Sequence, residues 1–150
     1  MPSALSYELH KLTARLDRAA DGLLRTHEGV SYSRFLSLFA VAGGAASQRE
    51  LAAWLGQTEP STSRMVGVLA QEGLLAVSTV PGQGNRRVLA LTQAGAELVD
   101  RCGRLLEGRF EELVKRSGVA YASYQRDTRR LLGQLDAAEQ RAAPDRTEAT

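Results

Sequence analysis

The amino-acid sequence predicts a mainly helical fold with one small β-hairpin, in the α+β class. Three observations lead to this prediction. Two short segments on either side of Gly56 each carry capping residues and apolar residues at helical spacing, and two strand-like runs joined by a Gly-rich stretch follow them. Longer apolar stripes at helical spacing flank this unit on both sides. Two helices around a tight turn, followed by a hairpin, form the pattern of a winged helix-turn-helix core, here with additional N- and C-terminal helices.

Composition indicates one modest core. The chain has 150 residues, of which 43% are hydrophobic, so we expect a single domain over 1–150. Within it we expect a winged helix-turn-helix lobe at about 31–91, flanking helices at about 3–27 and 92–136, and a frayed tail at 137–150, which has little to bury. The formal net charge of +2 is too small to indicate nucleic-acid binding by itself. No signal-peptide pattern or long apolar run is visible in the sequence, so we expect a cytoplasmic protein without a membrane partner.

A leucine stripe predicts the first helix. Its members recur at helical spacing at Leu5, Leu9, Leu12, Leu16, Leu23 and Leu24. Such a stripe needs a packing partner along its whole length, so this helix is expected to contact more than its own lobe.

Capping residues predict the first helix of the central pair. Ser47 can accept from free backbone N–H groups while Glu50, three residues later, reaches back to complete a capping box. Leu51 and Leu55 are four residues apart, so both lie on one face of the helix. Gly56 is expected to end the helix and to begin the tight turn.

The second helix of the pair is expected to begin at Thr58 and to stop at Gly73. Glu59 and Pro60 stand in its first turn, where a carboxylate suits the helix dipole and a missing N–H group costs nothing. Helical spacing turns one set inward: Thr62, Met65, Val66 and Leu69. It turns another set outward: Ser61, Ser63, Arg64, Gly67, Val68 and Gln71.

A hairpin wing is predicted after this helix. The segments 74–80 and 88–91 have strand composition, and residues 81–85 between them favour a turn. Arg86 and Arg87 then stand at the base of the wing, where guanidinium groups suit phosphates or a narrow minor groove. Ordinary solvation at the end of a strand is the alternative interpretation of this pair.

The outward face of the second helix suits the major groove of DNA. Small side chains permit a close approach, hydroxyl groups bind phosphates, and Arg or Gln bind base edges. A solvated helix face is the alternative for such a turn taken alone, and the wing that follows it favours DNA. The predicted DNA-binding residues are Ser47, Ser61, Thr62, Ser63, Arg64, Gln71, Arg86 and Arg87.

Two further helices are expected after the wing. The first starts at Thr92 and has its apolar stripe at Leu98, Val99, Cys102, Leu105, Leu106, Phe110, Leu113 and Val114. The second runs from about Val119 and carries Tyr121, Tyr124, Leu131, Leu132 and Leu135. These stripes exceed what one short lobe can cover, so with the N-terminal helix they predict a homodimer interface.

The sequence resembles the MarR family of bacterial transcription regulators. The matching pieces occur in the family's order: Gly29-Val30-Ser31 at a helix start, Leu51-Ala52-Ala53-Trp54-Leu55, the run from Ser61 to Arg64, Gly73-Leu74, and Leu91-Thr92-Gln93-Ala94-Gly95 after the wing. The resemblance implies that the first and last helices interlock two subunits. Two recognition helices about one DNA turn (roughly 34 Å) apart would then read a near-palindromic operator, mainly to repress nearby genes, with activation as the alternative.

The resemblance also implies a cleft for a small organic effector. The candidate residues are Leu24, His27, Tyr32, Arg34, Phe35 and Phe110. An Arg or His beside aromatic rings suits an acidic aromatic ligand, whereas plain core packing is the alternative role of Tyr32 and Phe35. Cys102, the only cysteine, lies on an apolar stripe, so a buried packing role is expected rather than peroxide sensing.

The wing departs from the family pattern at one place. Many family members have Asp-x-Arg before the Leu-Thr pair, where this chain has Gln83-Gly84-Asn85, and its arginines follow one and two residues later. Either Arg86 or Arg87 takes over the contact with the minor groove, which we favour, or that contact is weak.

Other classes of function find little support in the sequence. The two histidines, His10 and His27, are not spaced with Cys or acidic partners as metal ligands usually are. The motifs of hydrolases and phosphate-binding loops are missing from the sequence, so we expect no enzyme, no catalytic residue, no metal and no cofactor. The competing class is a winged helix that binds protein without specific DNA binding. Such a module would expose apolar anchors on the second helix, where this chain has Ser61, Arg64 and Gln71.

Overall fold

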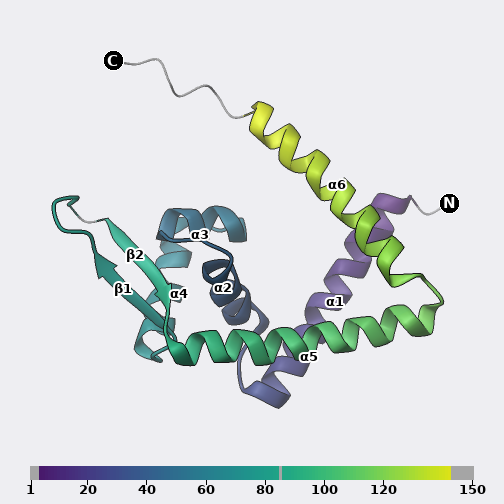
Figure 1. Ribbon diagram of the computed structural model, residues 1–150, viewed down its shortest axis with the longest axis horizontal. Coiled ribbons are helices and arrows are strands. Elements are labelled where there is room, and N and C mark those ends of the chain that lie inside the picture. The colour runs from purple at the N-terminus through teal and green to yellow at the C-terminus, as the bar shows by residue number, and fades with distance from the viewer. Residues whose placement is uncertain (1–3, 85, 143–150) are drawn as a thin grey trace. The chain divides into compact units, whose positions relative to one another are not determined.

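The computed structural model describes residues 4–84 and 86–142 (Figure 1). Its elements are, in order, α1 (Leu5–Glu28), α2 (Tyr32–Ala42), α3 (Gln48–Leu55), α4 (Glu59–Gln71), β1 (Leu75–Thr79), β2 (Arg87–Leu91), α5 (Gln93–Ser117) and α6 (Tyr121–Ala142). The predicted fold class, mainly α with a small hairpin, is confirmed. The chain divides into two compact units, Met1–Leu106 and Glu107–Thr150, and α5 continues from the first into the second.

A polar contact joins α1 to the start of α2, and a second contact caps α2 itself. The N–H group of Tyr32 donates to Asp21 Oδ1 at 2.9 Å, and the hydroxyl of Ser31 accepts from the N–H group of Arg34 at 3.3 Å. The guanidinium of Arg25 and the N–H of Tyr32 together hold the pKa of Asp21 below its usual value, in that order of importance. Asp21 is therefore an ionised cap that fixes the first turn of α2 against α1.

The core of the first unit is formed by one apolar cluster in which every element from α1 to α5 takes part. Its fully buried large side chains are Leu24, Leu38, Leu51 and Leu69. Phe35, Leu75, Leu89 and Leu98 are also buried in this cluster. Burying such side chains is the main source of stability of a lobe this small, at about 1.5–3 kcal/mol for each one.

The expected caps at Ser47 and Gly56 of α3 are present, whereas the predicted contact of Glu50 with the cap residue is replaced by one with Ala46. Ser47 Oγ accepts from the N–H group of Glu50 at 3.1 Å, and Gly56 ends the helix with φ of 61°, a conformation that favours glycine. The carboxylate of Glu50 accepts from Ala46 at 2.8 Å, one residue before the cap itself. The carbonyl of Ala46 in turn accepts from the N–H group of Leu89 at 2.8 Å, so the start of α3 is tied directly to the wing strand β2.

Helix α4 begins as the sequence predicts. Thr58 caps it by accepting from the N–H group of Ser61 at 3.3 Å, with Pro60 in the first turn. Its inner face buries Thr62, Val66 and Leu69, which matches three of the four expected positions, and the fourth, Met65, is half-buried.

The hairpin is close to its expected bounds. β1 and β2 are antiparallel, with Leu75 opposite Leu91 and Thr79 opposite Arg87, so Arg87 is part of the strand and Arg86 directly precedes it. The N–H group of Val80 donates to the carbonyl of Arg86 at 3.2 Å, which extends the pairing toward the tip. Asn85 of the predicted turn lies outside the described residues.

Thr92 joins the wing to the end of α4. Its hydroxyl donates to the carbonyl of Gly73 at 2.6 Å and accepts from the N–H group of Gly95 at 3.1 Å, while its own N–H group donates to Leu74 at 3.2 Å. A Cβ atom on Gly95 would overlap the carbonyl oxygen of Leu74. The Leu-Thr-x-x-Gly motif of this chain therefore has a physical cause, because Thr92 caps α5 and Gly95 lets α5 approach the backbone.

The second unit contains the end of α5 and all of α6. Tyr121 donates a hydrogen bond to Glu107, and its ring packs edge-on against Phe110 with centroids 6.4 Å apart. Helix α6 continues to Ala142, past the boundary at 136 that the sequence suggested, and residues 143–150 of the expected tail lie outside the described residues. Within 4–84 and 86–142, no helix combines the length and the apolar character needed to cross a bilayer.

Candidate nucleic-acid interface

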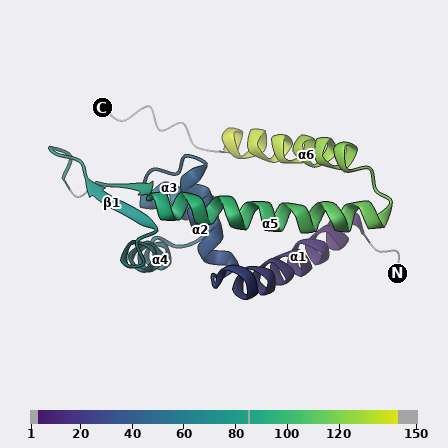
Figure 2. The same cartoon turned by 60° about the horizontal axis from the view of Figure 1, so that its bottom comes forward.

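An open depression of about 410 Å³ lies where the wing meets the first turns of α3 and α4. It is lined by Ser47, Gln48, Arg49, Glu59, Ser63, Arg86 and Arg87, and we call it the wing depression. Figure 2 shows the hairpin extending beyond the helices of this unit. The site therefore combines a helix N-terminus, hydroxyl groups and guanidinium groups on one surface, which are the groups that bind the backbone and bases of DNA.

Four of the eight predicted DNA-binding residues line this depression. Ser47 contributes from the cap of α3, Ser63 from α4, and Arg86 and Arg87 from the wing. The other exposed members lie elsewhere along α4. These are Ser61 and Arg64 near its start and Gln71 at its last residue.

Thr62 is the exception, and its prediction as a DNA contact is corrected. Its side chain is 0% exposed, and its hydroxyl donates to the carbonyl of Thr58 at 3.0 Å. Helical spacing in the sequence already assigns Thr62 to the inner face of the helix, so it is not on the outer face that would meet DNA. Its hydroxyl satisfies a backbone group inside the lobe, because a buried polar group requires a partner.

The arginines of the wing differ in their surroundings. Arg86 Nη1 donates to Gln83 Oε1 at 3.2 Å, so the guanidinium of Arg86 is held against the hairpin turn. Arg87 is exposed on β2. Both side chains reach the wing depression, which gives either one access to a phosphate bound there.

Three residues of the depression were missed by the sequence reasoning. Gln48 and Arg49 form the first turn of α3, and Glu59 is the first residue of α4. The sequence indicates for Glu59 only a favourable interaction with the helix dipole. The first turns of α3 and α4 line the same depression in this chain, so long polar side chains in both first turns are the sequence signal for this set.

The charges of the wing depression remain available to a ligand. It contains three arginines and one carboxylate, Glu59. Within the part of the chain that the structure describes, Arg49, Arg87 and Glu59 form no ion pair within 4.0 Å. The surface therefore has a net positive charge with a single acidic group at the start of α4.

The predicted effector residues are divided among several environments. Leu24 and Phe35 are buried in the core, His27 is exposed, and Tyr32 stacks on Phe35 with ring centroids 6.1 Å apart. Burial, followed by the nearby charge of Asp17, raises the pKa of Tyr32. Phe110 belongs to the second unit.

Arg34, the remaining predicted effector residue, already has a protein partner. Its Nη1 atom lies 2.8 Å from Glu72 Oε1, just after the last residue of α4. A carboxylate ligand of Arg34 would have to compete with Glu72.

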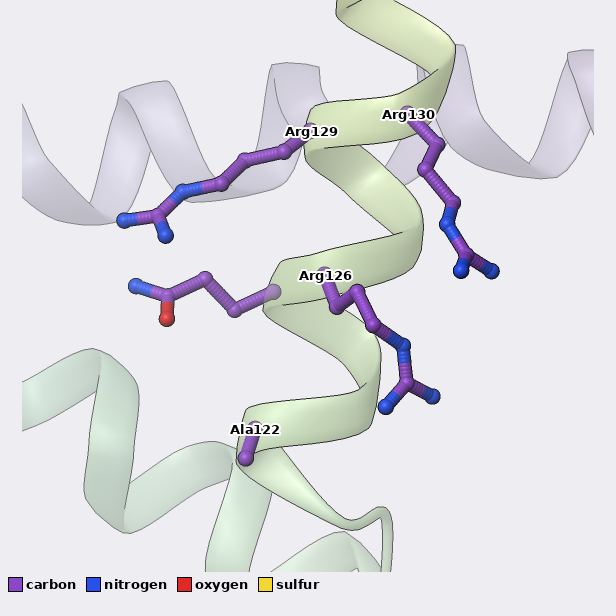
Figure 3. A pocket seen from close by; sticks show the side chains of 5 residues that line it. Ala122, Arg126, Arg129 and Arg130 are labelled. Carbon is purple, nitrogen blue, oxygen red and sulfur yellow. The ribbon is translucent and has the colours of Figure 1, made fainter.

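A second depression, of about 420 Å³, lies along α6 (Figure 3). It is lined by Ala122, Gln125, Arg126, Arg129 and Arg130. Arg126 and Arg130 point to the same side and lie 3.5 and 3.6 Å from Asp127, while Arg129 points away from them. The three guanidinium groups do not converge, so they form a solvated helix face rather than a clamp for one anion.

Cys102 has the packing role that the sequence suggests. Its side chain is fully buried in the core. Burial, with a smaller contribution from the charge of Glu28, raises the pKa of the Cys102 thiol to about 11, against the opposing effect of Arg101. The thiol is therefore protonated and unreactive near neutral pH.

Comparison with known families decides the family of the central segment. Residues 28–87 match the sequence model of the MarR family. This segment belongs to the MarR family. It extends from the end of α1 to the start of β2, so the MarR-like match includes the capped helix pair and most of the wing. No curated protein matches the chain at a significant level.

Solved structures share the MarR fold over most of the chain. Wild-type MarR from Escherichia coli, in its apo form, has a TM-score of 0.72 at 20% identity, covering 90% of this chain and 98% of the other. A complex of MepR from Staphylococcus aureus with DNA has a TM-score of 0.67 at 20% identity, with coverages of 90% and 96%. A MarR family protein from Mycobacterium tuberculosis in complex with salicylic acid has a TM-score of 0.67 at 22% identity, with coverages of 89% and 96%.

Proposed function

We propose that this protein is a sequence-specific DNA-binding regulator of transcription, acting as a homodimeric repressor of nearby genes on a near-palindromic operator. The observation that carries the proposal is the wing depression, in which the first turns of α3 and α4 and the wing arginines share one surface. The MarR-family match over 28–87 supports it, as does the fold shared with a MepR–DNA complex. A role at operator DNA would place the protein in the cytoplasm.

In this proposal α4 enters the major groove by its N-terminal half. Ser61 and Ser63 permit a close approach and donate to phosphates, and Arg64 binds a guanine edge. The wing then follows the DNA backbone, where Arg86 or Arg87 contacts phosphates or the adjacent minor groove. Gln71, at the opposite end of α4, is the least favourably placed of the predicted contacts, because recognition helices present their N-terminal residues to the bases.

A homodimer supplies the second half of the contact. Apolar residues that need a partner are exposed on α1, at Leu5, Tyr7, Leu9 and Leu12. Others are exposed on α6, at Leu131, Leu132 and Leu135. Covering such side chains in a second copy removes apolar surface from water and would set two copies of α4 on successive turns of DNA.

A small acidic effector is proposed to release the DNA. Tyr32 stacks on the buried ring of Phe35 at the first turn of α2, and His27 offers an imidazole at the end of α1. Arg34 offers a guanidinium group that a carboxylate ligand would take over from Glu72. The salicylic acid bound to the Mycobacterium tuberculosis relative supports an aromatic acid as the first ligand to test. Such a ligand alters DNA binding only when it binds the free and the DNA-bound conformations unequally.

Fluorescence anisotropy tests the proposal directly. The protein is titrated into its own upstream DNA and into a scrambled duplex of equal length, at two salt concentrations. A preference of about a hundredfold or more for the native duplex, with binding that weakens as salt rises, is the expected result. Equal and weak binding to both duplexes and to a pool of randomised duplexes would contradict the proposal and favour a protein-binding winged helix.

A further inference from the structure

We propose that Glu59 is a base-reading residue that selects cytosine at one position in each half of the operator. The inference rests on the proposed function and adds a specificity determinant to it. Its basis is the presence of one carboxylate within a surface that otherwise presents guanidinium, hydroxyl and amide groups.

The position of Glu59 favours a contact with a base. It is the first residue of α4, and the N-terminal residues of a recognition helix are those that reach base edges. Its neighbours on the outer face, Ser61 and Ser63, are too small to hold the helix away from the groove. A side chain of this length at this position therefore points from the helix start into the surface that meets DNA.

Because Glu59 is a carboxylate, it can only accept hydrogen bonds, so it needs a donor group on the DNA. Near phosphates a carboxylate is repelled, so without a donor on the DNA it weakens binding to every sequence. In the major groove cytosine presents an amino group, which is a hydrogen-bond donor, and no acceptor lies beside it on the same base. Adenine pairs its amino group with the N7 acceptor, guanine presents two acceptors, and thymine presents an acceptor and a methyl group. Cytosine is therefore the base whose edge best matches a carboxylate.

Among residues 4–84 and 86–142, no cationic side chain forms an ion pair with the Glu59 carboxylate. Arg49, Arg86 and Arg87 line the same depression, and within the described residues none of them lies within 4.0 Å of the Glu59 carboxylate in an ion pair. Interaction with the α4 dipole stabilises a first-turn carboxylate, but that role is independent of the DNA sequence. A change in DNA sequence preference when Glu59 is substituted would therefore distinguish a base contact from a purely structural role of Glu59.

Selection from a randomised duplex pool tests the inference. The parent is expected to prefer cytosine by about tenfold at one symmetric pair of positions, because one good base contact discriminates at about that level. Glu59→Gln should lose this preference and shift it toward adenine, whose amino and N7 groups match an amide. The same variant should bind scrambled DNA more tightly, since one negative charge per subunit is removed.

Two further variants make the result decisive. Glu8→Gln removes a carboxylate from the first turn of α1, and it should keep the cytosine preference of the parent. Glu59→Asp keeps the first-turn charge on a shorter side chain, and it should weaken the preference for cytosine without creating one for adenine. This second variant preserves the test if Glu59→Gln fails to fold, which its circular dichroism spectrum would reveal.

The two proposals fail in different ways. If Glu59→Gln, or Glu59→Asp in its place, keeps the base preference of the parent at every position while affinity changes uniformly, Glu59 reads no base and the inference is overturned. If the parent itself shows no base preference at any position, the proposed sequence-specific function fails and the inference fails with it.

Discussion

Arg34 and Glu72 form an ion pair that joins the first turn of α2 to the C-terminal end of α4. Arg34 Nη1 lies 2.8 Å from Glu72 Oε1, and the two side chains are 36% and 39% exposed. Asp21 of α1 holds the same turn of α2 through the N–H group of Tyr32. The first turn of α2 thus connects α1 with the end of the proposed recognition helix.

Removing this pair should affect DNA binding more than stability. Arg34→Leu should lower the free energy of unfolding by less than about 1 kcal/mol, since half-exposed ion pairs contribute little. Its preference for operator over scrambled DNA should fall several-fold, because α4 loses one of its attachments. The charge-reversed double variant Arg34→Glu/Glu72→Arg should recover much of that preference in anisotropy titrations. Equal losses in the single and the double variants would show that the pair does not position α4.

Gly95→Ala should destabilise the first unit. The added methyl group would overlap the carbonyl oxygen of Leu74, and relieving such an overlap typically costs about 1–3 kcal/mol. Gly103→Ala on the same helix is the matched control, because nothing lies within 4 Å of a Cβ there and alanine favours helix. Urea denaturation should therefore give opposite signs for the two variants, and the same sign for both would contradict this account of Gly95.

The Cys102 thiol should give the free energy of unfolding a particular pH dependence. The pKa of this thiol is about 11 in the folded chain and near 9 without burial. Below pH 9 both states keep the proton, so stability is unaffected. Between pH 9 and 11 the unfolded chain loses the proton first, and stability falls as pH rises. Urea titrations of the parent should show a steeper fall in this window than those of Cys102→Ala, and parallel curves would argue against a buried thiol.

Arginines of α4 and of the wing should differ in their effect on binding. Arg64→Ala should cost about 1–3 kcal/mol on the operator and little on scrambled DNA, since removing a side chain that reads a base relaxes specificity. Arg87→Ala should weaken binding to both duplexes and reduce the magnitude of the salt slope by about 1 for each phosphate that the variant no longer neutralises. Anisotropy titrations at four salt concentrations measure the affinity for each duplex and its salt dependence. Identical behaviour of the two variants would contradict these roles.

The exposed leucines of α6 test the proposed homodimer. Leu131→Arg/Leu135→Arg places two charges on apolar side chains that are 59% and 60% exposed in the single chain. The double variant should elute as a monomer in size-exclusion chromatography with light scattering, because burying unpaired charges in an interface is costly. Gln134→Arg, which adds a charge at an exposed polar position of the same helix, should remain a dimer. A dimeric double variant would place the interface elsewhere.

Local signals in the sequence determined much of the fold. The caps at Ser47, Gly56 and Thr58 and the turn between the strands depend on residues a few positions apart, and these predictions are confirmed. The sequence predicts an end of α6 at about 136, six residues before its end at Ala142, because the residues beyond 136 have little to bury. Residues 137–142 are Ala, Glu, Gln and Arg, which favour helix even where they bury little.

The candidate site was predictable in part. Ser47, Ser63, Arg86 and Arg87 are brought together as the motif suggested. Arg49 and Glu59 were missed, because the grouping of two first turns with the wing is a tertiary relationship that neither segment reveals alone. The pairing of Arg34 with Glu72 has the same origin, since the rest of α2, α3 and all of α4 separate the two residues along the chain.

The hydrogen bond from Leu89 to Ala46 has a thermodynamic consequence. Together with Thr92, it fixes the base of the wing to the helices before any ligand arrives. Arg87 therefore stands on a strand that is already ordered, and docking onto DNA does not require that strand to fold. The heat-capacity change of association should then reflect the apolar area at the contact, without the larger negative contribution that accompanies the folding of a segment on binding.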